Sequence, residues 1–123
     1  MTHDINIHHE DNHESASSYL VEEIRNLLVN SNRDFSIGLS GGNTPKLTYS
    51  MMAEKLDDLS KTFLWTIDDR WIEEDNDLSN QRMINEYFEK TDANILKFEF
   101  TSSTPESDAK KYEDKLKSTI QRF

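Results

Sequence analysis

The most constraining feature of the sequence is a strand of buried type that leads directly into two adjacent glycines and then into a helix. Residues 35–39 alternate apolar and small side chains, which predicts a strand, and Ser40-Gly41-Gly42-Asn43-Thr44-Pro45 follows at once. Thr44 is a good N-cap and proline is tolerated at the first helical position, so we expect a helix to begin at Pro45. A strand, a turn and a helix in this order are typical of α/β proteins.

The rest of the chain continues this alternation. Apolar residues at helical spacing predict helices that begin near residues 15, 45, 79 and 105, and further strands are predicted over 63–67 and 95–100. We therefore expect one α/β domain over 1–123, with a mostly parallel sheet and helices on both faces as three layers. Residues 1–13 form a polar tail, in which the alternation of Ile5 and Ile7 with polar residues suggests a short strand.

Composition narrows the possible partners. The chain carries 24 acidic and 14 basic side chains, for a formal net charge of −10, and no cysteine. Nucleic acids and anionic membranes repel such a chain, and no apolar run of about 18 residues offers a membrane span. We therefore expect a cytoplasmic protein that binds neither nucleic acid nor membrane. The sequence indicates no cofactor and leaves the oligomeric state open.

The glycine loop has the composition of an anion site. Gly41 and Gly42 allow the backbone to come close to a ligand, and the N–H groups at a helix start attract negative charge. The hydroxyls of Ser40 and Thr44 can add donors. The pattern is neither the Walker nor the dinucleotide motif, and an ordinary glycine turn explains it equally well.

A second polar cluster, Asp68-Asp69-Arg70-Trp71, follows the strand predicted over 63–67. Ligands of open α/β sheets bind beyond the carboxyl ends of the strands, where this cluster and the glycine loop both fall. The carboxylates and the arginine can orient hydroxyls or hold a phosphate, and a surface ion-pair cluster is the alternative of equal weight. Trp71 is interpreted as a packing residue.

Together these clusters resemble the N-terminal half of the 6-phosphogluconolactonases, which form a wider group with the glucosamine-6-phosphate deaminases. The matching residues are Leu39 to Lys46, Asp68 to Trp71, and Asp77 with Ser79-Asn80. The Ser-Gly-Gly-x-Thr-Pro form and the arginine after the acidic pair favour the lactonase branch, because deaminases usually have a tyrosine in place of that arginine.

The resemblance implies a fold like that of glucosamine-6-phosphate deaminases and ribose-5-phosphate isomerases. It implies a hydrolase that opens 6-phospho-glucono-1,5-lactone to 6-phosphogluconate in the pentose phosphate pathway. The phosphosugar-binding set that it implies is Ser40, Gly41, Gly42, Asn43, Thr44, Lys46 and Asn80, and the catalytic set is Asp68, Asp69 and Arg70. Within the first set Asn80 is interpreted chiefly as a structural brace. Asp69 replaces the usual glutamate, and Glu73 replaces a customary proline.

The family's general base is a histidine of a Gly-x-x-Gly-His type motif in the second half of the fold, and the present sequence has no such motif. Its four histidines (His3, His8, His9 and His13) all precede the first predicted helix, and hydrophobic content is only 34%. We therefore expect a truncated chain that hydrolyses little lactone by itself. Two alternatives stay open: a relative of the deaminase-isomerases, in which Asp68 or Asp69 abstracts a proton, and a non-catalytic module that binds a phosphosugar.

Two further patterns resemble metal sites. The run from His9 to His13 matches His-Glu-x-x-His, but that motif works on a helix, and its Asp-Asn centre is typical of a helix start. The residues from Asp75 to Glu86 follow a calcium-loop register, but Asn80 stands where glycine is needed and a strand precedes the loop. We expect no metal site in either.

Overall fold

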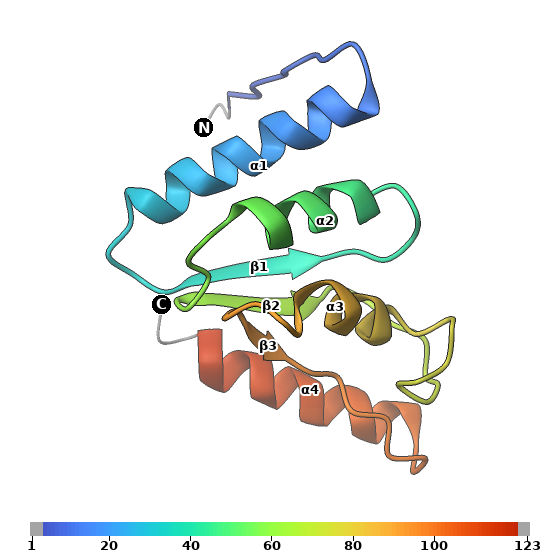
Figure 1. Cartoon of the computed structure of the whole chain (residues 1–123). Helices are drawn as coiled ribbons and strands as arrows, with labels where there is room; N and C mark the ends of the chain where they lie inside the picture. The colour runs from blue at the N-terminus through green and yellow to red at the C-terminus, as the bar shows by residue number, and fades with distance from the viewer. Residues whose placement is uncertain (1–3, 121–123) are drawn as a thin grey trace.

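The computed structural model describes residues 4–120, which form four helices and three strands. The elements are α1 (His13–Val29), β1 (Phe35–Leu39), α2 (Lys46–Lys55), β2 (Thr62–Thr66), α3 (Asn80–Phe88), β3 (Asn94–Leu96) and α4 (Pro105–Ile120). The strands form one parallel sheet in the order β1-β2-β3. Figure 1 shows α1 and α2 on one side of the strands and α4 on the other. The predicted α/β class and parallel sheet are confirmed.

The core lies between the sheet and the helices α2 and α3. Ile37 of β1 lies beside Leu64 of β2, so both side chains point to the same face of the sheet. Tyr49 of α2 contacts Phe88 of α3, with ring centroids 6.0 Å apart. The fully buried apolar side chains on this side include Met52, Leu59, Leu64, Ile84 and Phe88. Their removal from water holds both helices on the sheet.

The other face of the sheet is covered less completely. Trp65 points to it and is half-buried, and Ile67 just after β2 is 59% exposed. The Trp65 ring lies across β1, where its Nε1 donates a hydrogen bond of 2.9 Å to Ser36 Oγ. A Cβ atom at Gly38 would come within 2.7 Å of this ring. The glycine of β1 therefore makes room for the tryptophan of β2.

The third strand is shorter than predicted, because it ends at Leu96 and not at Phe100. Tyr112 of α4 supplies the hydrogen bonds that a longer strand would make. Its hydroxyl accepts from the backbone N–H of Thr66 at 2.9 Å and donates to the carbonyl of Thr66 at 3.0 Å. Burial raises the pKa of Tyr112 to about 12, so the phenol keeps the proton that it donates.

Two helix starts differ from the predictions. Helix α2 begins at Lys46, one residue later than expected, and no side chain caps it. The residues before it form a turn, in which Lys46 N–H donates to the carbonyl of Asn43 at 3.3 Å. The Thr44 side chain is therefore not an N-cap. Helix α1 begins at His13 because the side chain of Asn12 accepts from Ser15 N–H at 2.8 Å.

The polar tail thus ends at residue 12, and its described part contains no strand, since Ile5 and Ile7 are 83% and 73% exposed. The predicted starts of α3 and α4 are confirmed: Ser79 Oγ accepts from Arg82 N–H and Thr104 Oγ1 accepts from Ser107 N–H, each at 3.1 Å. Residues 1–3 and the end of the last predicted helix lie outside the described residues. Within 4–120, no helix has the length and apolar character needed to cross a membrane.

Candidate functional site

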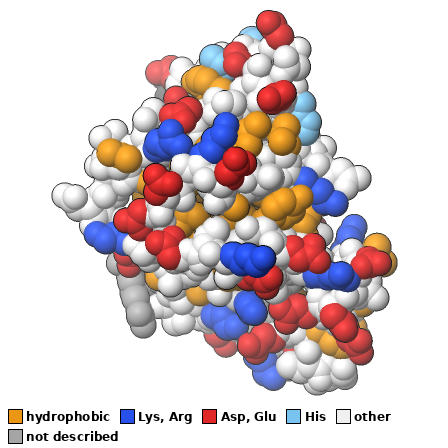
Figure 2. All heavy atoms as spheres, viewed as in Figure 1, with side chains coloured by type: hydrophobic (Ala, Val, Ile, Leu, Met, Phe, Trp, Pro, Cys, Tyr) orange, Lys and Arg blue, Asp and Glu red, His pale blue; other side chains and the backbone are white. Residues whose placement is uncertain are grey.

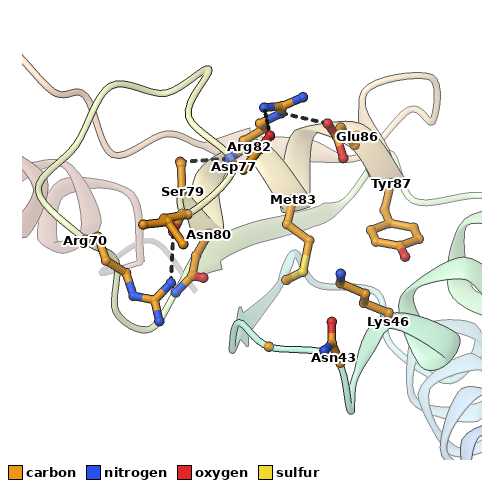
Figure 3. A pocket seen from close by; sticks show the side chains of 12 residues that line it. Asn43, Lys46, Arg70, Asp77, Ser79, Asn80, Arg82, Met83, Glu86 and Tyr87 are labelled. Carbon is orange, nitrogen blue, oxygen red and sulfur yellow. Dashed lines mark hydrogen bonds and ion pairs between the residues drawn. The ribbon is translucent and has the colours of Figure 1, made fainter.

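The loops after β1 and β2 meet at one edge of the sheet, as expected for the carboxyl ends of parallel strands. Between them and α3 lies a cavity of about 500 Å³. Figure 3 shows Lys46 facing Met83 and Tyr87 of α3 across this space. The lining residues are Gly42, Asn43, Lys46, Arg70, Asp77, Leu78, Ser79, Asn80, Arg82, Met83, Glu86 and Tyr87.

Asn80 connects the two loops. Its Nδ2 donates to the carbonyl of Asp68 at 3.0 Å, and a Cβ atom at Gly41 would lie 2.1 Å from its Oδ1. A side chain at position 41 would therefore displace the Asn80 amide from its bond to Asp68. Gly42 is required for another reason: its φ is +89°, in the left-handed region, while the space around it is open. The first glycine allows contact with α3, and the second turns the chain at the cavity.

Asp69 holds the start of α3. Its carboxylate accepts hydrogen bonds from the backbone N–H groups of Arg70 at 2.8 Å, Asn80 at 2.7 Å and Gln81 at 2.9 Å. Together with Ser79, it satisfies donors that a helix start leaves without intrahelical partners, and its negative charge suits the helix dipole. The carboxylate is thus directed at the protein's own backbone, and Asp69 does not line the cavity.

The side chain of Asp68 is exposed, just beyond the carboxyl end of β2. Its backbone carbonyl accepts hydrogen bonds from the side chains of Thr66 at 2.6 Å and Asn80 at 3.0 Å. In the part of the chain that the structure describes, its carboxylate has no hydrogen-bond or ion-pair partner. The backbone at Asp68 is therefore fixed, and the carboxylate stays available to a ligand.

The cations of the cavity differ in their pairing. Arg82 is neutralised by ion pairs with Asp77 at 2.6 Å and Glu86 at 2.8 Å. Lys46 and Arg70 form no ion pair with any residue in 4–120, and Arg70 Nη1 is positioned by the carbonyl of Leu78 at 2.9 Å. Net positive charge is thus concentrated where the uncapped start of α2 also presents its backbone N–H groups.

The predicted site residues fall into three groups. Gly42, Asn43, Lys46, Arg70 and Asn80 line the cavity together. Ser40, Gly41 and Thr44 line a second, mainly apolar cavity of about 700 Å³ between α1 and β1. Asp68 and Asp69 line neither.

His13 is a contact that the sequence analysis missed. Its Nε2 donates to the carbonyl of Thr44 at 2.9 Å, and one helical turn further along α1 the buried Ser17 accepts from Thr48 Oγ1 at 3.0 Å. These bonds tie α1 to the glycine loop and to α2. They span 31 positions of the chain, so no local pattern indicates them. The ion pair of Arg82 with Glu86 was also missed, although its spacing of four on a helix is a recognisable signal.

The pattern from His9 to His13 does not lie on one helix. His9 and Glu10 precede α1, so they share no helix face with His13. Among the described residues, no cluster of three histidine or acidic side chains is arranged for a metal ion.

Trp71 contacts Phe100, with ring centroids 5.1 Å apart, and donates to Asp108 Oδ2 at 3.0 Å. Trp71 thus packs on one side, while 39% of it remains exposed.

Comparisons with known proteins identify the family of this fold. The family model of glucosamine-6-phosphate isomerases/6-phosphogluconolactonases matches residues 8–123. A 6-phosphogluconolactonase of Synechocystis sp. is 34% identical over 90 residues, which cover 70% of this chain and 38% of that protein. The crystal structure of a 6-phosphogluconolactonase from Thermotoga maritima matches 83% of this chain with a TM-score of 0.72 and 31% identity.

The fold also matches that of a 6-phosphogluconolactonase from Shewanella baltica, with a TM-score of 0.77 and 23% identity over 89% of this chain. In both crystal structures the match covers 50% of the longer protein. This chain thus spans half or less of the length of these relatives. On the family match over residues 8–123, the chain belongs to the glucosamine-6-phosphate isomerase/6-phosphogluconolactonase family.

Proposed function

We propose that this chain forms the phosphate-binding part of a 6-phosphogluconolactonase, which hydrolyses 6-phospho-glucono-1,5-lactone to 6-phosphogluconate in the pentose phosphate pathway. The observation that carries the proposal is the joint position of Lys46 and Arg70. Both are cations without an ion pair in the described chain, and both line the 500 Å³ cavity beside the uncapped start of α2.

The phosphate is placed at the glycine loop. A phosphate dianion needs several N–H donors and positive charge, and the backbone around Gly42 and the start of α2 offers the donors. Lys46 supplies a point charge and Arg70 a planar group that binds two oxygens at once. Ser40 and Thr44 line the second, apolar cavity, so the proposed phosphate site does not use their hydroxyls.

The two aspartates have different roles in this proposal. Asp68, with its exposed carboxylate beyond the end of β2, lies against the lactone ring and orients its hydroxyls. Asp69 is a positioning residue, because its carboxylate accepts three backbone N–H groups and holds the start of α3. Arg70 lies in the same loop, directly after Asp69, so Asp69 also helps to position the Arg70 guanidinium.

The water-activating base comes from elsewhere in the complete fold. Addition of water to the lactone carbonyl requires a base for the water and donors for the developing oxyanion. None of the histidines that the structure describes lines the cavity. Since the chain spans about half the length of its relatives, we propose that the second half supplies this base and that the chain alone turns over little lactone.

Binding of the reaction product tests the phosphate site without requiring turnover. We expect titration with 6-phosphogluconate, followed by amide NMR, to shift the signals of residues 41–47 and Arg70. Lys46→Ala and Arg70→Ala should each weaken binding by about tenfold or more, because each removes a charge-assisted contact of about 1.5–3 kcal/mol. Lys61→Ala, which alters an exposed lysine at the opposite end of β2 from the cavity, is the matched control.

The same titration separates the alternatives. Equal shifts with inorganic phosphate alone would indicate an anion site without sugar specificity. Tighter binding of glucosamine 6-phosphate would favour deaminase-type chemistry. If the amides of residues 41–47 do not respond at millimolar 6-phosphogluconate, the proposed phosphate site is wrong. Rapid lactone hydrolysis by this chain alone would refute the need for a second half.

A further inference from the structure

One charged residue of α4 differs from the others on this helix. Figure 2 shows acidic and basic side chains side by side over the lower part of the molecule, where α4 lies (Figure 1). On the helix surface Lys110, for example, pairs with Asp114 at 3.0 Å. Asp108 is buried instead: only 1% of it is exposed, and it forms no ion pair with a residue of the described chain. Its charge is therefore compensated chiefly by hydrogen bonds, without which a buried carboxylate is costly.

The donors to Asp108 come from two regions. Three lie in the segment just before α4: the N–H of Thr101 at 2.8 Å, the hydroxyl of Thr101 at 2.5 Å and the hydroxyl of Ser103 at 3.5 Å. The fourth is Trp71 Nε1, which donates to Asp108 Oδ2 at 3.0 Å from 37 positions away. The first three bonds are local and hold the start of α4. Among the described residues, only the bond from Trp71 connects Asp108 to the loop of the candidate site.

Trp71 needs this bond to keep one orientation. Its ring meets Phe100 near the edge, with centroids 5.1 Å apart and ring planes at 64°, and 39% of the residue stays exposed. Packing on one side restrains a ring without fixing its rotation, whereas a hydrogen bond has a preferred direction. The carboxylate of Asp108 therefore sets the orientation of the Trp71 ring.

Helix α4 holds the site loop at both ends. One helical turn beyond Asp108, the hydroxyl of Tyr112 bonds to the N–H and to the carbonyl of Thr66, the last residue of β2. Trp71, four residues after the next position of the chain, is held by Asp108. The contacts from α4 thus bracket residues 67–70, and Arg70 at the end of this segment lines the 500 Å³ cavity.

We propose that Asp108 is a positioning residue for the phosphate site: it holds Trp71, and Trp71 fixes the adjacent Arg70 so that its guanidinium faces the cavity. Asp108 does not bind the phosphate itself, because it is buried and lines neither of the two cavities described above. The effect on binding rests on the proposed function, whereas the placement of Arg70 requires no ligand.

Three variants separate the bond from the packing around it. Trp71→Phe keeps an aromatic ring beside Phe100 but removes the N–H donor, and Asp108→Ala removes the acceptor. We expect each to weaken binding of 6-phosphogluconate to this chain by about fivefold, because Arg70 is still present but is less well placed. In Asp108→Asn the amide oxygen still accepts from Trp71 while the amide nitrogen donates to the Thr101 hydroxyl, so binding should stay within about twofold of the native value.

A double-mutant cycle tests whether the effect passes through Arg70. In the Arg70→Ala background, Trp71→Phe and Asp108→Ala should change the affinity by less than about twofold, because the group that they position is gone. An equal loss in both backgrounds would overturn the proposal, since a general effect on the fold does not depend on Arg70. Ser103→Ala, which removes another donor to Asp108, is the matched control and should leave binding unchanged.

A measurement without ligand distinguishes this proposal from the proposed function. NMR relaxation of the Arg70 Nε–H group should show greater motion in Trp71→Phe and Asp108→Ala than in the native chain, and no change in Ser103→Ala. Unchanged Arg70 relaxation in Trp71→Phe, which keeps the other donors to Asp108, would show that the proposal is wrong even if Asp108→Ala does not fold. Greater Arg70 motion in the variants of a native chain that binds no 6-phosphogluconate would refute the proposed function and support the role of Asp108.

Discussion

Helices α2 and α3 both begin at the same cavity, but their first turns are capped differently. The start of α3 is held by Asp69 and Ser79, whose side-chain oxygens accept from the backbone N–H groups of residues 80–82. The start of α2 has no side-chain cap. The protein thus uses its own carboxylate at one helix start, and on the proposed function the other, beside Lys46, binds the phosphate. The difference separates a structural helix end from the proposed binding one.

Removal of Asp69 should have the largest effect on this contrast. Asp69→Ala leaves three backbone donors without their charged acceptor, and hydrogen bonds to charged groups contribute about 1.5–3 kcal/mol each. We expect the free energy of unfolding to fall by about 3 kcal/mol in denaturant titrations. Asp69→Asn keeps one acceptor oxygen and should lose less. A loss smaller than that of Ser79→Ala would contradict the role of Asp69 as the main cap of α3.

Ser79→Ala should have a moderate effect. It removes one side-chain acceptor, the partner of Arg82 N–H at 3.1 Å, and loss of such a cap costs about 1 kcal/mol. The same measurement in the Asp69→Asn background shows whether the two caps act together. Strictly additive losses would mean that each cap works alone, despite their shared helix turn.

Acid should weaken the start of α4 over a definite pH range. Asp108 accepts hydrogen bonds from Thr101 and Trp71, and these bonds lower its pKa to about 2. Because the folded-state pKa lies below the unfolded value of 3.8, the stability that Asp108 contributes is complete above about pH 4 and is lost as the pH falls to about 2. The Tm values of the native chain and of Asp108→Asn should therefore converge as the pH falls from about 4 to about 2. A difference in Tm that stays constant over this range would contradict the lowered pKa of Asp108.

Thr44→Ala should have the smallest effect on stability. The Thr44 side chain caps no helix, and its contact with His13 uses the backbone carbonyl, which the variant keeps. We expect the free energy of unfolding to change by less than about 0.5 kcal/mol. Binding of 6-phosphogluconate should also change little, since Thr44 lines the other cavity. A large loss of stability would show that α2 is capped after all, and the contrast with α3 would disappear.

Local signals predicted the parts of the fold that depend on neighbouring residues. The helix starts near residues 79 and 105 were predicted because each depends on a side chain, Ser79 or Thr104, that bonds to an N–H only three positions away. Thr44 shows the limit of such signals. Its residue type favours a cap, but the turn after Gly42 delays α2 by one residue and directs the Thr44 carbonyl to His13.

Long-range contacts account for the other differences. The cap from Asp69 bonds across the loop to residues 80 and 81, whereas the family resemblance implied a catalytic role for this carboxylate. The end of β3 is decided by Tyr112, which bonds to Thr66 from 46 positions away. No periodic pattern in the sequence indicates either contact, because each depends on how separate elements pack.

The sequence by itself determined the alternation of strands and helices, the parallel sheet, and the two polar clusters at the carboxyl ends of the strands, because hydrophobic period and glycine placement act locally. Only the tertiary structure decided which predicted site residues share a cavity. It left Lys46 and Arg70 without ion pairs in the described chain and used Asp69 as a helix cap. It placed Ser40 and Thr44 at the apolar cavity between α1 and β1. The physical reason is that charge pairing, capping and burial depend on distances between elements, which the packing of the helices on the sheet sets.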